Sequence, residues 1–312
     1  MSFFENLHSK KYDSIISFES EDQSLSKVQK FYKVAPFPSY EKNESIGDIL
    51  HKGNRNDLAK EVKEKFKFNM NILEAGSGTC QLASYLSIGT NNNVFALDGT
   101  LESLKEGEKF KIKSKIKNLN LVHGDILKNI FKDNIFDFVW CSGVLHHTKD
   151  AYVGFKNLCK CVKNNGFILI GLYNRYGRLR TLVRNFISKL LINKKIRINF
   201  LMFMDPVLRK LNRDKQKNKD KIDAWLRDQY FHPIETLHTV DQVLDWFNRN
   251  NIEFISSIPS LEYDEFEKKG LFETQHKGTF FDRLFVQIKM IFSSYGSEGG
   301  LFVIIGKKNG NN

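Results

Sequence analysis

The feature that most constrains the fold is a regular alternation of short β-rich runs and helical patterns through the middle of the chain. Five runs rich in leucine, β-branched and aromatic residues lie at 72–75, 94–98, 119–122, 136–141 and 167–173. Helical patterns fill the gaps, for example at 81–88, 101–110 and 152–162. Strands that alternate with helices predict βαβ units and a largely parallel sheet. A further helix at 239–250, with Thr239 as its N-cap, and two runs at 253–258 and 300–306 predict the end of the same sheet.

Polar residues and glycines follow four of these runs. In an open α/β sheet a ligand binds at the carboxyl ends of the strands, near the point where the strand order reverses. Asp98 lies 20 residues beyond Gly78, a spacing at which a carboxylate can bond both hydroxyls of a ribose. Gln81 stands where a dinucleotide-binding fingerprint needs a small residue, which counts against a nicotinamide or flavin site. The segments concerned are 74–79, 98, 123–126 and 141–147.

Together these segments resemble the class I S-adenosylmethionine-dependent methyltransferases. The pieces that carry the resemblance are 73–79, 95–98, 124–126 and 136–147, within a region that spans about 65–173. The resemblance implies an α/β fold with a Rossmann-like, doubly wound, seven-stranded and mostly parallel sheet. The segments 228–235, 238–239 and 298–302 are also similar to a set of bacterial small-molecule methyltransferases whose substrates are unassigned.

The resemblance also implies a role for each site residue, with S-adenosylmethionine as the cofactor. Glu74, Gly76 and Gly78 would line its methionine portion, Asp98 would hold the ribose, Asp125 and Ile126 would frame the adenine, and Ser142 and Gly143 would lie near the sulfonium and the acceptor. The chain lacks an Asn/Asp-Pro-Pro-Tyr/Phe run after the fourth strand, and it has no Pro-Cys pair. It therefore does not resemble the amino-group or the cytosine-C5 DNA methyltransferases.

Methyl transfer needs at most one base from the protein, because positioning of the acceptor and exclusion of water supply most of the catalysis. His147 is one candidate, and its alternative is hydrogen-bonded scaffolding with His146. His232 and Glu235 are candidates because three-residue spacing can place both on one helix face, or else they form a turn around Pro233. No metal is expected, since adjacent histidines point apart and no third ligand is suitably spaced.

The net charge of +12 comes from one segment. Residues 174–222 contain fifteen Lys or Arg and three Asp, so the rest of the chain is balanced. Within this segment an apolar stripe recurs at helical spacing from Leu179 to Leu191, and Arg180, Arg184 and Lys189 are expected on the opposite side. Three interpretations stay open: a helical cap packed over the active site with a solvated outer face, an amphipathic surface on anionic lipid, or a surface that follows nucleic-acid phosphates. The charge run at 209–221 is expected to be a flexible loop.

These observations predict four parts. Residues 1–44 form a lead-in and an aromatic lid in which Tyr32 either closes over the cofactor or belongs to the core. Residues 45–173 form the cofactor-binding core, residues 174–238 a basic helical insertion after the fifth strand, and residues 239–312 the closing helix and strands.

The chain shows no apolar run of about 20 residues, no signal-peptide pattern and only four cysteines, so a reducing, cytoplasmic setting is expected. The function expected is methyl transfer to O, N or C of a small-molecule or lipid-linked acceptor, with possible peripheral contact to an anionic membrane. The alternatives are a nucleic-acid methyltransferase and a non-catalytic S-adenosylmethionine-binding scaffold. The oligomeric state stays open.

Overall fold

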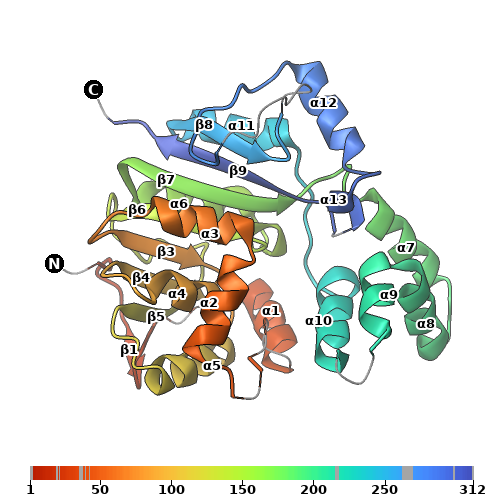
Figure 1. The fold of residues 1–312 in the computed structure, drawn as a ribbon, viewed down its shortest axis with the longest axis horizontal. Helices are drawn as coiled ribbons and strands as arrows, with labels where there is room; N and C mark the ends of the chain where they lie inside the picture. Colours follow the sequence, from red (N-terminus) through yellow and green to blue (C-terminus); the bar gives the residue numbers. More distant parts are fainter. Residues whose placement is uncertain are drawn as a thin grey trace.

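A computed structural model describes residues 3–310, apart from residues 19, 21, 35–37, 39, 42, 215–217, 262–269 and 298. Within these residues the chain forms one nine-stranded sheet in the order β1-β2-β5-β4-β3-β6-β7-β9-β8 (Figure 1). The strands are β1 (Lys10–Tyr12), β2 (Ile15–Ser17), β3 (Asn71–Ala75), β4 (Asn93–Asp98), β5 (Leu119–His123), β6 (Phe136–Ser142), β7 (Val162–Tyr173), β8 (Ile252–Ile258) and β9 (Leu301–Lys308). The six strands from β2 to β7 are parallel, and β9 runs antiparallel between β7 and β8.

The sheet has two strands more than the seven predicted. The additional pair, β1 and β2, is a hairpin in the segment that the sequence suggested was only a lead-in. β2 continues the sheet beyond β5, with Ile15 beside Leu121 and Ser17 beside His123. Ile15 is fully buried, and Ser14 donates two hydrogen bonds to Glu108 of the neighbouring helix. Strands of three residues are too short to show a period-two pattern, so the existing sheet edge, and not the local sequence, specifies them.

Helices cover both faces of the sheet, as a doubly wound fold requires. One face packs against α2 (Ile46–Asn54), α3 (Asp57–Lys65), α4 (Gln81–Ser87) and α5 (Leu101–Lys113), and the other against α6 (Ala151–Cys161) and α11 (Val240–Arg249). Successive strand residues alternate between the two cores, as Ile72 and Leu73 do. The predicted N-cap Thr239 is confirmed, because its side chain accepts a hydrogen bond from the N–H of Gln242.

Three further helices lie outside these layers and were not predicted. They are α1 (Gln23–Val34), α12 (Phe280–Lys289) and the short α13 (Ser294–Ser297), and η1 (Leu145–His147) is a single 3₁₀ turn after β6. Among the described residues, no helix combines the length and the apolar character needed to cross a bilayer.

Four helices form the insertion between β7 and α11. They are α7 (Leu179–Lys189), α8 (Lys194–Met204), α9 (Pro206–Asn212) and α10 (Lys219–Tyr230), and Figure 1 shows them grouped beyond the arrowheads of the parallel strands. A small core of Leu201, Leu208, Ile222, Leu226 and Tyr230 holds them together. The charge run at 209–221 is helical at both ends, where it ends α9 and begins α10, and its described residues 213, 214 and 218 form turns between them. The expected loop is therefore confined to the middle of the run, where residues 215–217 lie outside the described part of the chain.

The orientation of α7 is opposite to the one expected for a helical cap over the active site. Its apolar stripe faces solvent, whereas Thr181, Arg184 and Ser188 are buried. Arg184 lies 3.7 Å from Asp205, which also accepts hydrogen bonds from Trp225 and Tyr230. Since a buried carboxylate needs a cation and donors, this polar group draws the polar face of α7 inward. The stripe therefore does not pack over the active site.

Candidate active site

A cavity of about 490 Å³ opens at the carboxyl ends of the parallel strands. It lies where the strand order reverses, because β3 pairs with β4 on one side and with β6 on the other. Its walls come from the turns after β3, β4, β5 and β6, together with α1 and α10. All eight residues expected to bind a cofactor line it: Glu74, Gly76, Gly78, Asp98, Asp125, Ile126, Ser142 and Gly143.

The turn after β3 brings backbone to the cavity wall. Gly76 has a φ of +81°, and a Cβ at that position would lie 2.1 Å from a methyl carbon of Val144. Its N–H donates to the carbonyl of Leu97, which ties the turn to the end of β4 at 2.7 Å. Gly78, with a φ of +52°, donates its N–H to Asp98 Oδ2 at 2.7 Å. Only glycine fits at position 76, because any side chain there would collide with Val144 and would also need a positive φ.

Asp98 ends β4 with both carboxylate oxygens partly engaged. Oδ2 accepts from Gly78 and Oδ1 accepts from the N–H of Thr100 at 2.7 Å. Burial raises the pKa of this carboxyl to about 6, although the two backbone donors oppose the shift. Each oxygen of a carboxylate can accept more than one hydrogen bond, so Asp98 can still serve a ligand with two adjacent hydroxyl groups.

Glu74 lies deeper in the same wall. Its Oε2 is buried and has no hydrogen-bond partner among the described residues. Burial raises the pKa of this carboxyl well above its usual range, and the nearby Asp98 adds to the rise. A buried, unpaired acceptor is costly unless a ligand satisfies it. Glu74 is therefore suited to a cationic ligand group.

Asp125, Ile126 and helix α1 form another part of the cavity wall. Asp125 Oδ1 accepts from the N–H of Leu127 at 2.9 Å, and Oδ2 accepts from the hydroxyl of Ser20 at 3.2 Å. Helix α1 contributes Leu25, Val28 and Tyr32 to the wall. Tyr32 therefore lies where the sequence analysis expected a lid, while residues 35–37 and 39 of that aromatic run lie outside the described residues.

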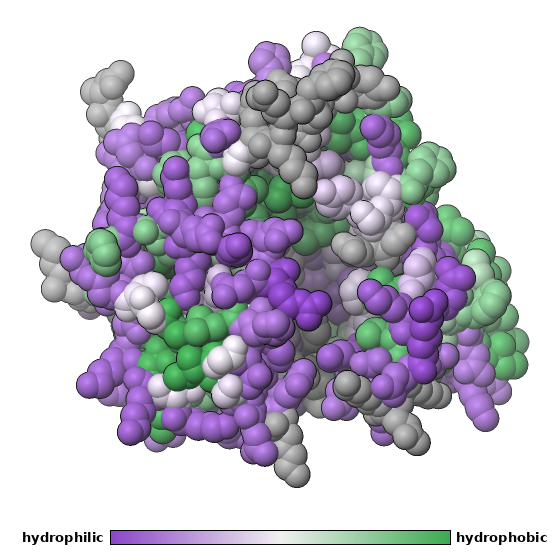
Figure 2. All heavy atoms as spheres, viewed as in Figure 1, coloured by the Kyte–Doolittle hydropathy of each residue, from purple (hydrophilic) through white to green (hydrophobic). Residues whose placement is uncertain are grey.

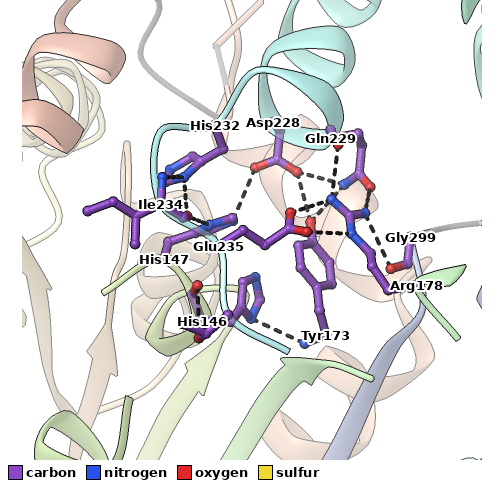
Figure 3. Close-up of polar contacts among 11 residues, drawn as sticks. His146, His147, Tyr173, Arg178, Asp228, Gln229, His232, Ile234, Glu235 and Gly299 are labelled. Atoms are coloured by element: carbon purple, nitrogen blue, oxygen red, sulfur yellow. Dashed lines mark hydrogen bonds and ion pairs between the residues drawn. The ribbon is translucent and has the colours of Figure 1, made fainter. Parts of the chain in front are cut away.

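His147 lies on the 3₁₀ turn after β6 and faces the cavity (Figure 3). Its Nδ1 is 2.8 Å from the carbonyl of Ile234, so Nδ1 carries the proton and donates. Its Nε2 lies 3.8 Å from Asp228 Oδ1 and has no hydrogen-bond partner among the described residues. Burial lowers the pKa of His147 to about 4, so the ring is neutral at pH 7 with a free lone pair on Nε2.

Asp228 and Tyr173 complete this group, and the sequence analysis missed both as site residues. Asp228 Oδ2 accepts from the hydroxyl of Tyr173 at 3.1 Å and from the side-chain amide of Gln229 at 2.7 Å. Asp228, Tyr173 and Gln229 all line the cavity. One feature of the sequence pointed to Asp228: it is the first residue of the segment 228–235, which is similar to a set of bacterial methyltransferases.

His232 lies behind His147 and does not line the cavity. The two rings stack with centroids 3.6 Å apart, and His232 also contacts the rings of Phe31 and Tyr32. Its Nδ1 donates to the carbonyl of Ile234 at 2.6 Å, the same acceptor that His147 uses. Burial lowers the pKa of His232 to about 3. The structure thus places this candidate next to the cavity but not in its wall.

Glu235 is held by Arg178 and also lies outside the cavity wall. The guanidinium donates to both of its carboxylate oxygens, at 3.1 and 2.5 Å (Figure 3). Arg178 is 1% exposed and lies over the Tyr173 ring, with 4.0 Å between the guanidinium carbon and the ring centroid. Its remaining N–H groups bond Gln229 and the carbonyl of Gly299. Arg178 and its partners thus connect β7 and α7 to α10. Glu298, the first residue of the segment 298–302, lies outside the described residues.

Residues 73–170 match the family described as "Methyltransferase domain". The matched segment contains the end of β3, all of β4 to β6, most of β7 and the eight residues that were expected to bind the cofactor. Residues 73–170 of this chain are therefore similar to a methyltransferase domain.

Relatives of this methyltransferase domain include the demethylmenaquinone methyltransferase of Shouchella clausii, which is 27% identical over 149 residues. The match covers 46% of this chain and 63% of that relative, so it spans less than two thirds of the relative's length. Among solved structures, PKMT2 of Rickettsia typhi has a TM-score of 0.57 at 15% identity, covering 85% of this chain and 53% of that one. A complex of the same protein with AdoHcy has a TM-score of 0.56 at 14% identity, covering 78% and 49%. These likenesses support the Rossmann-like fold.

The residues present in the methyltransferase domain fit S-adenosylmethionine, which is a cation with a ribose diol. Glu74 offers an unpaired buried oxygen, and Asp98 offers a carboxylate with remaining acceptor capacity. Gly143, with a φ of +78°, has open space where a Cβ would be. Among the described residues, no group of three or more His, Cys, Asp or Glu is arranged to hold a metal ion.

Proposed function

We propose that this protein transfers the methyl group of S-adenosylmethionine to a small-molecule or lipid-linked acceptor bound between the turn after β6 and α10. The observation that carries the proposal is the placement of His147, with its free Nε2, in the same cavity as Glu74 and Asp98. A cofactor pocket and a positioned base share one enclosed space, as an in-line transfer requires.

The cofactor part of the proposal assigns each wall residue a contact. Glu74 accepts from the ammonium group of the methionine portion, and the turn at Gly76 and Gly78 lets that portion approach the backbone. Asp98 accepts from the two ribose hydroxyls. Asp125 and Ile126 bind the adenine, with the Leu25 and Tyr32 side chains of α1 over the other side. Ser142 and Gly143 border the reacting centre.

When bound, S-adenosylmethionine supplies an electrophilic methyl group. The residues of the chain then need only orient the acceptor and remove its proton. His147 Nε2 takes that proton, because Nδ1 is already fixed as the donor to Ile234. Asp228, 3.8 Å away, stabilises the imidazolium that results, and Tyr173 and Gln229 hold Asp228 in place.

His232 and Glu235 act on this group indirectly. The stacked ring of His232 restricts the orientation of His147. Glu235 neutralises Arg178, which in turn supports Tyr173 and Gln229. We therefore propose that both are positioning residues and that His147 is the base.

The acceptor end of the cavity favours an apolar or ring-shaped acceptor. Trp140, Trp225, Ile234 and Leu301 line the cavity together with the polar group around Asp228. The names of the relatives, demethylmenaquinone methyltransferases, support an acceptor of the small-molecule class.

Calorimetry with S-adenosylmethionine tests the common premise. We expect Asp98→Ala to weaken binding roughly 100-fold, because two hydrogen bonds to a charged acceptor are lost. The matched control is Asp245→Ala, which removes an exposed carboxylate of α11. Absence of binding by the wild-type protein would contradict the proposal. Binding without methyl transfer to any small-molecule or lipid extract would instead indicate a non-catalytic binder.

A further inference from the structure

The outward face of α7 is apolar, although this helix has a polar face available. Leu179, Leu182, Val183, Phe186, Ile187 and Leu190 are all exposed. Phe186 is 66% and Leu190 67% exposed, while the buried residues of the helix are Thr181, Arg184 and Ser188. Exposed apolar residues scattered singly are ordinary, but a continuous helical stripe is not. A continuous exposed stripe of this kind is typical of an interaction surface.

Helix α12 repeats the arrangement. Phe281, Phe285 and Ile288 lie at i, i+4 and i+7 and are exposed, and Phe292 continues the row just beyond the helix. The buried side of α12 carries Val286 and Gln287. Together, residues 179–204 and 280–292 hold fifteen of the twenty-one large hydrophobic side chains that are exposed in the described part of the chain. The exposed apolar area is therefore concentrated on these helices.

The two helices meet at one corner of the molecule. Arg180 donates to the carbonyl of Ile291, just after α12, at 3.3 Å. Gly177, just before α7, lies against Met290, and Asn174 bonds Gln287. Figure 2 shows hydrophobic residues gathered along the edge formed by α7 and α8 and again over α12. We call the exposed apolar residues of α7, α8 and α12, with Phe292, the outer surface.

The charged residues around the outer surface are mostly basic, although α12 also carries Asp282 beside Arg283 and Lys289. Residues 179–212 contain eight Lys or Arg and a single acid, Asp205, which is buried. On α7, Arg180 and Lys189 border the apolar stripe on its two sides. Long basic side chains at such positions can keep their charged ends in water while the stripe lies on an apolar surface. Lys194 and Lys195 are exposed at the start of α8, and Lys289 is exposed at the end of α12. Apolar helix faces with basic margins are the pattern of helices that lie in a bilayer interface.

We propose that the outer surface docks the protein on a membrane that contains anionic lipid. The apolar side chains enter the region between headgroups and acyl chains, and the surrounding Lys and Arg side chains contact lipid phosphates. A second copy of the chain fits less well, because a two-fold contact through this surface would bring basic margins face to face. A nucleic acid would leave the apolar stripes unsatisfied.

The docking surface and the active site share one structural unit. Helix α10 lines the cavity with Trp225 and Asp228, and it packs against α7 and α9 in the insertion. This location suits an acceptor that resides in, or is carried by, a bilayer. The docking itself does not depend on the proposed methyl transfer, because it rests on exposure and charge alone.

Vesicle flotation of the full chain tests the proposal. The probes are vesicles of phosphatidylcholine alone and vesicles with a substantial fraction of phosphatidylglycerol. We expect binding to the anionic vesicles and at least about tenfold weaker binding to the neutral ones. The double variant Phe186→Ser/Phe281→Ser should lose at least about tenfold in partitioning, as should Lys194→Ala/Lys195→Ala.

Matched controls come from other parts of the surface. Phe68→Ser changes a phenylalanine that is 85% exposed before β3, and Lys115→Ala/Lys117→Ala changes two exposed lysines before β5. Both controls should bind like the wild-type protein. Circular-dichroism spectra and a thermal unfolding midpoint like those of the wild-type protein show that the fold of each variant is intact. This control does not use S-adenosylmethionine, so the test is separate from that of the proposed function.

Three results would overturn the proposal. They are no binding of the wild-type chain to anionic vesicles, equal loss in the Phe68→Ser control, and a wild-type dimer in sedimentation that Phe186→Ser/Phe281→Ser dissociates without any vesicle binding. The last result would assign the outer surface to a second copy of the chain.

Discussion

At the scale of single residues, two carboxyls in one cavity have different partners. Asp98 is bonded by two backbone N–H groups, whereas Glu74 keeps one oxygen without a partner among the described residues. Burial raises the pKa of both, and that of Asp98 to about 6. The protonation of Asp98 therefore changes within an accessible pH range.

We expect the affinity for S-adenosylmethionine to fall about tenfold when the pH is lowered from 7 to 5. Below about pH 6 the carboxyl of Asp98 takes a proton, so a ligand that needs both oxygens as acceptors competes with that proton. Calorimetry across this range measures the effect. The Asp98→Asn variant should bind weakly and lose the part of this dependence that comes from Asp98, while Glu74, whose pKa burial also raises, can still contribute. A flat profile of the wild-type protein would contradict the expectation.

His147 is the second residue whose state can be tested. We expect His147→Gln to lower kcat at least about 100-fold while the Kd for S-adenosylmethionine changes little, because a lost base affects only the transition state. Asp228→Asn and His232→Ala should lower kcat less, since they support His147 and do not take the proton. The exposed His51→Gln is the matched control. Unchanged turnover of His147→Gln in a methyl-transfer assay would remove it from the mechanism.

At the scale of elements, the insertion is attached to the core through one buried cation. Arg178 follows β7 and joins Glu235, Gln229 of α10 and the backbone of Gly299. Every partner lies more than 50 residues away in sequence. A single side chain thus connects the start of α7, the end of α10 and the approach to β9.

We expect Glu235→Gln to destabilise the protein by about 3 kcal/mol, because it leaves the buried guanidinium of Arg178 without a carboxylate. Urea unfolding at neutral pH measures the loss, and limited proteolysis should show earlier cleavage within 174–238. The control Asp245→Asn breaks an exposed i,i+4 pair with Arg249 and should cost no more than about 0.5 kcal/mol. If the free energy of unfolding fell by no more than in the control, a neutral amide would be a sufficient partner for Arg178, and the expectation would be wrong.

At the scale of the whole molecule, charge and apolar exposure divide the protein into two parts. The αβ core is electrically balanced and buries its apolar residues on both faces of the sheet. The excess of +12 lies in residues 174–222 of the insertion, which also carry the exposed apolar stripe of α7. The proposed membrane docking would make this net charge part of the surface that meets the bilayer and not of the cavity.

Local sequence determined the parts of this protein that depend on neighbouring residues. The turn at Gly76 and Gly78 and the carboxylate of Asp98 were predictable, because a strand end and the residues just after it specify them together. Helix α11 was predictable for the same reason, since the spacing of Val243, Trp246 and Phe247 gives both the helix and its buried face.

Only the tertiary structure decided what depends on distant partners. Amphipathicity gives α7 an apolar face but does not say which way that face points; Asp205, from the next part of the insertion, turns the polar face inward. The hairpin β1–β2 exists because β5 offers a free edge. The contact of Tyr173 with Asp228 joins residues 55 apart in the chain. The turns after β3 and β4 in the cavity wall are thus encoded locally, whereas the contact between β7 and α10 and the direction in which the α7 stripe points arise from long-range packing. A single sequence carries no periodic signal for packing of this kind.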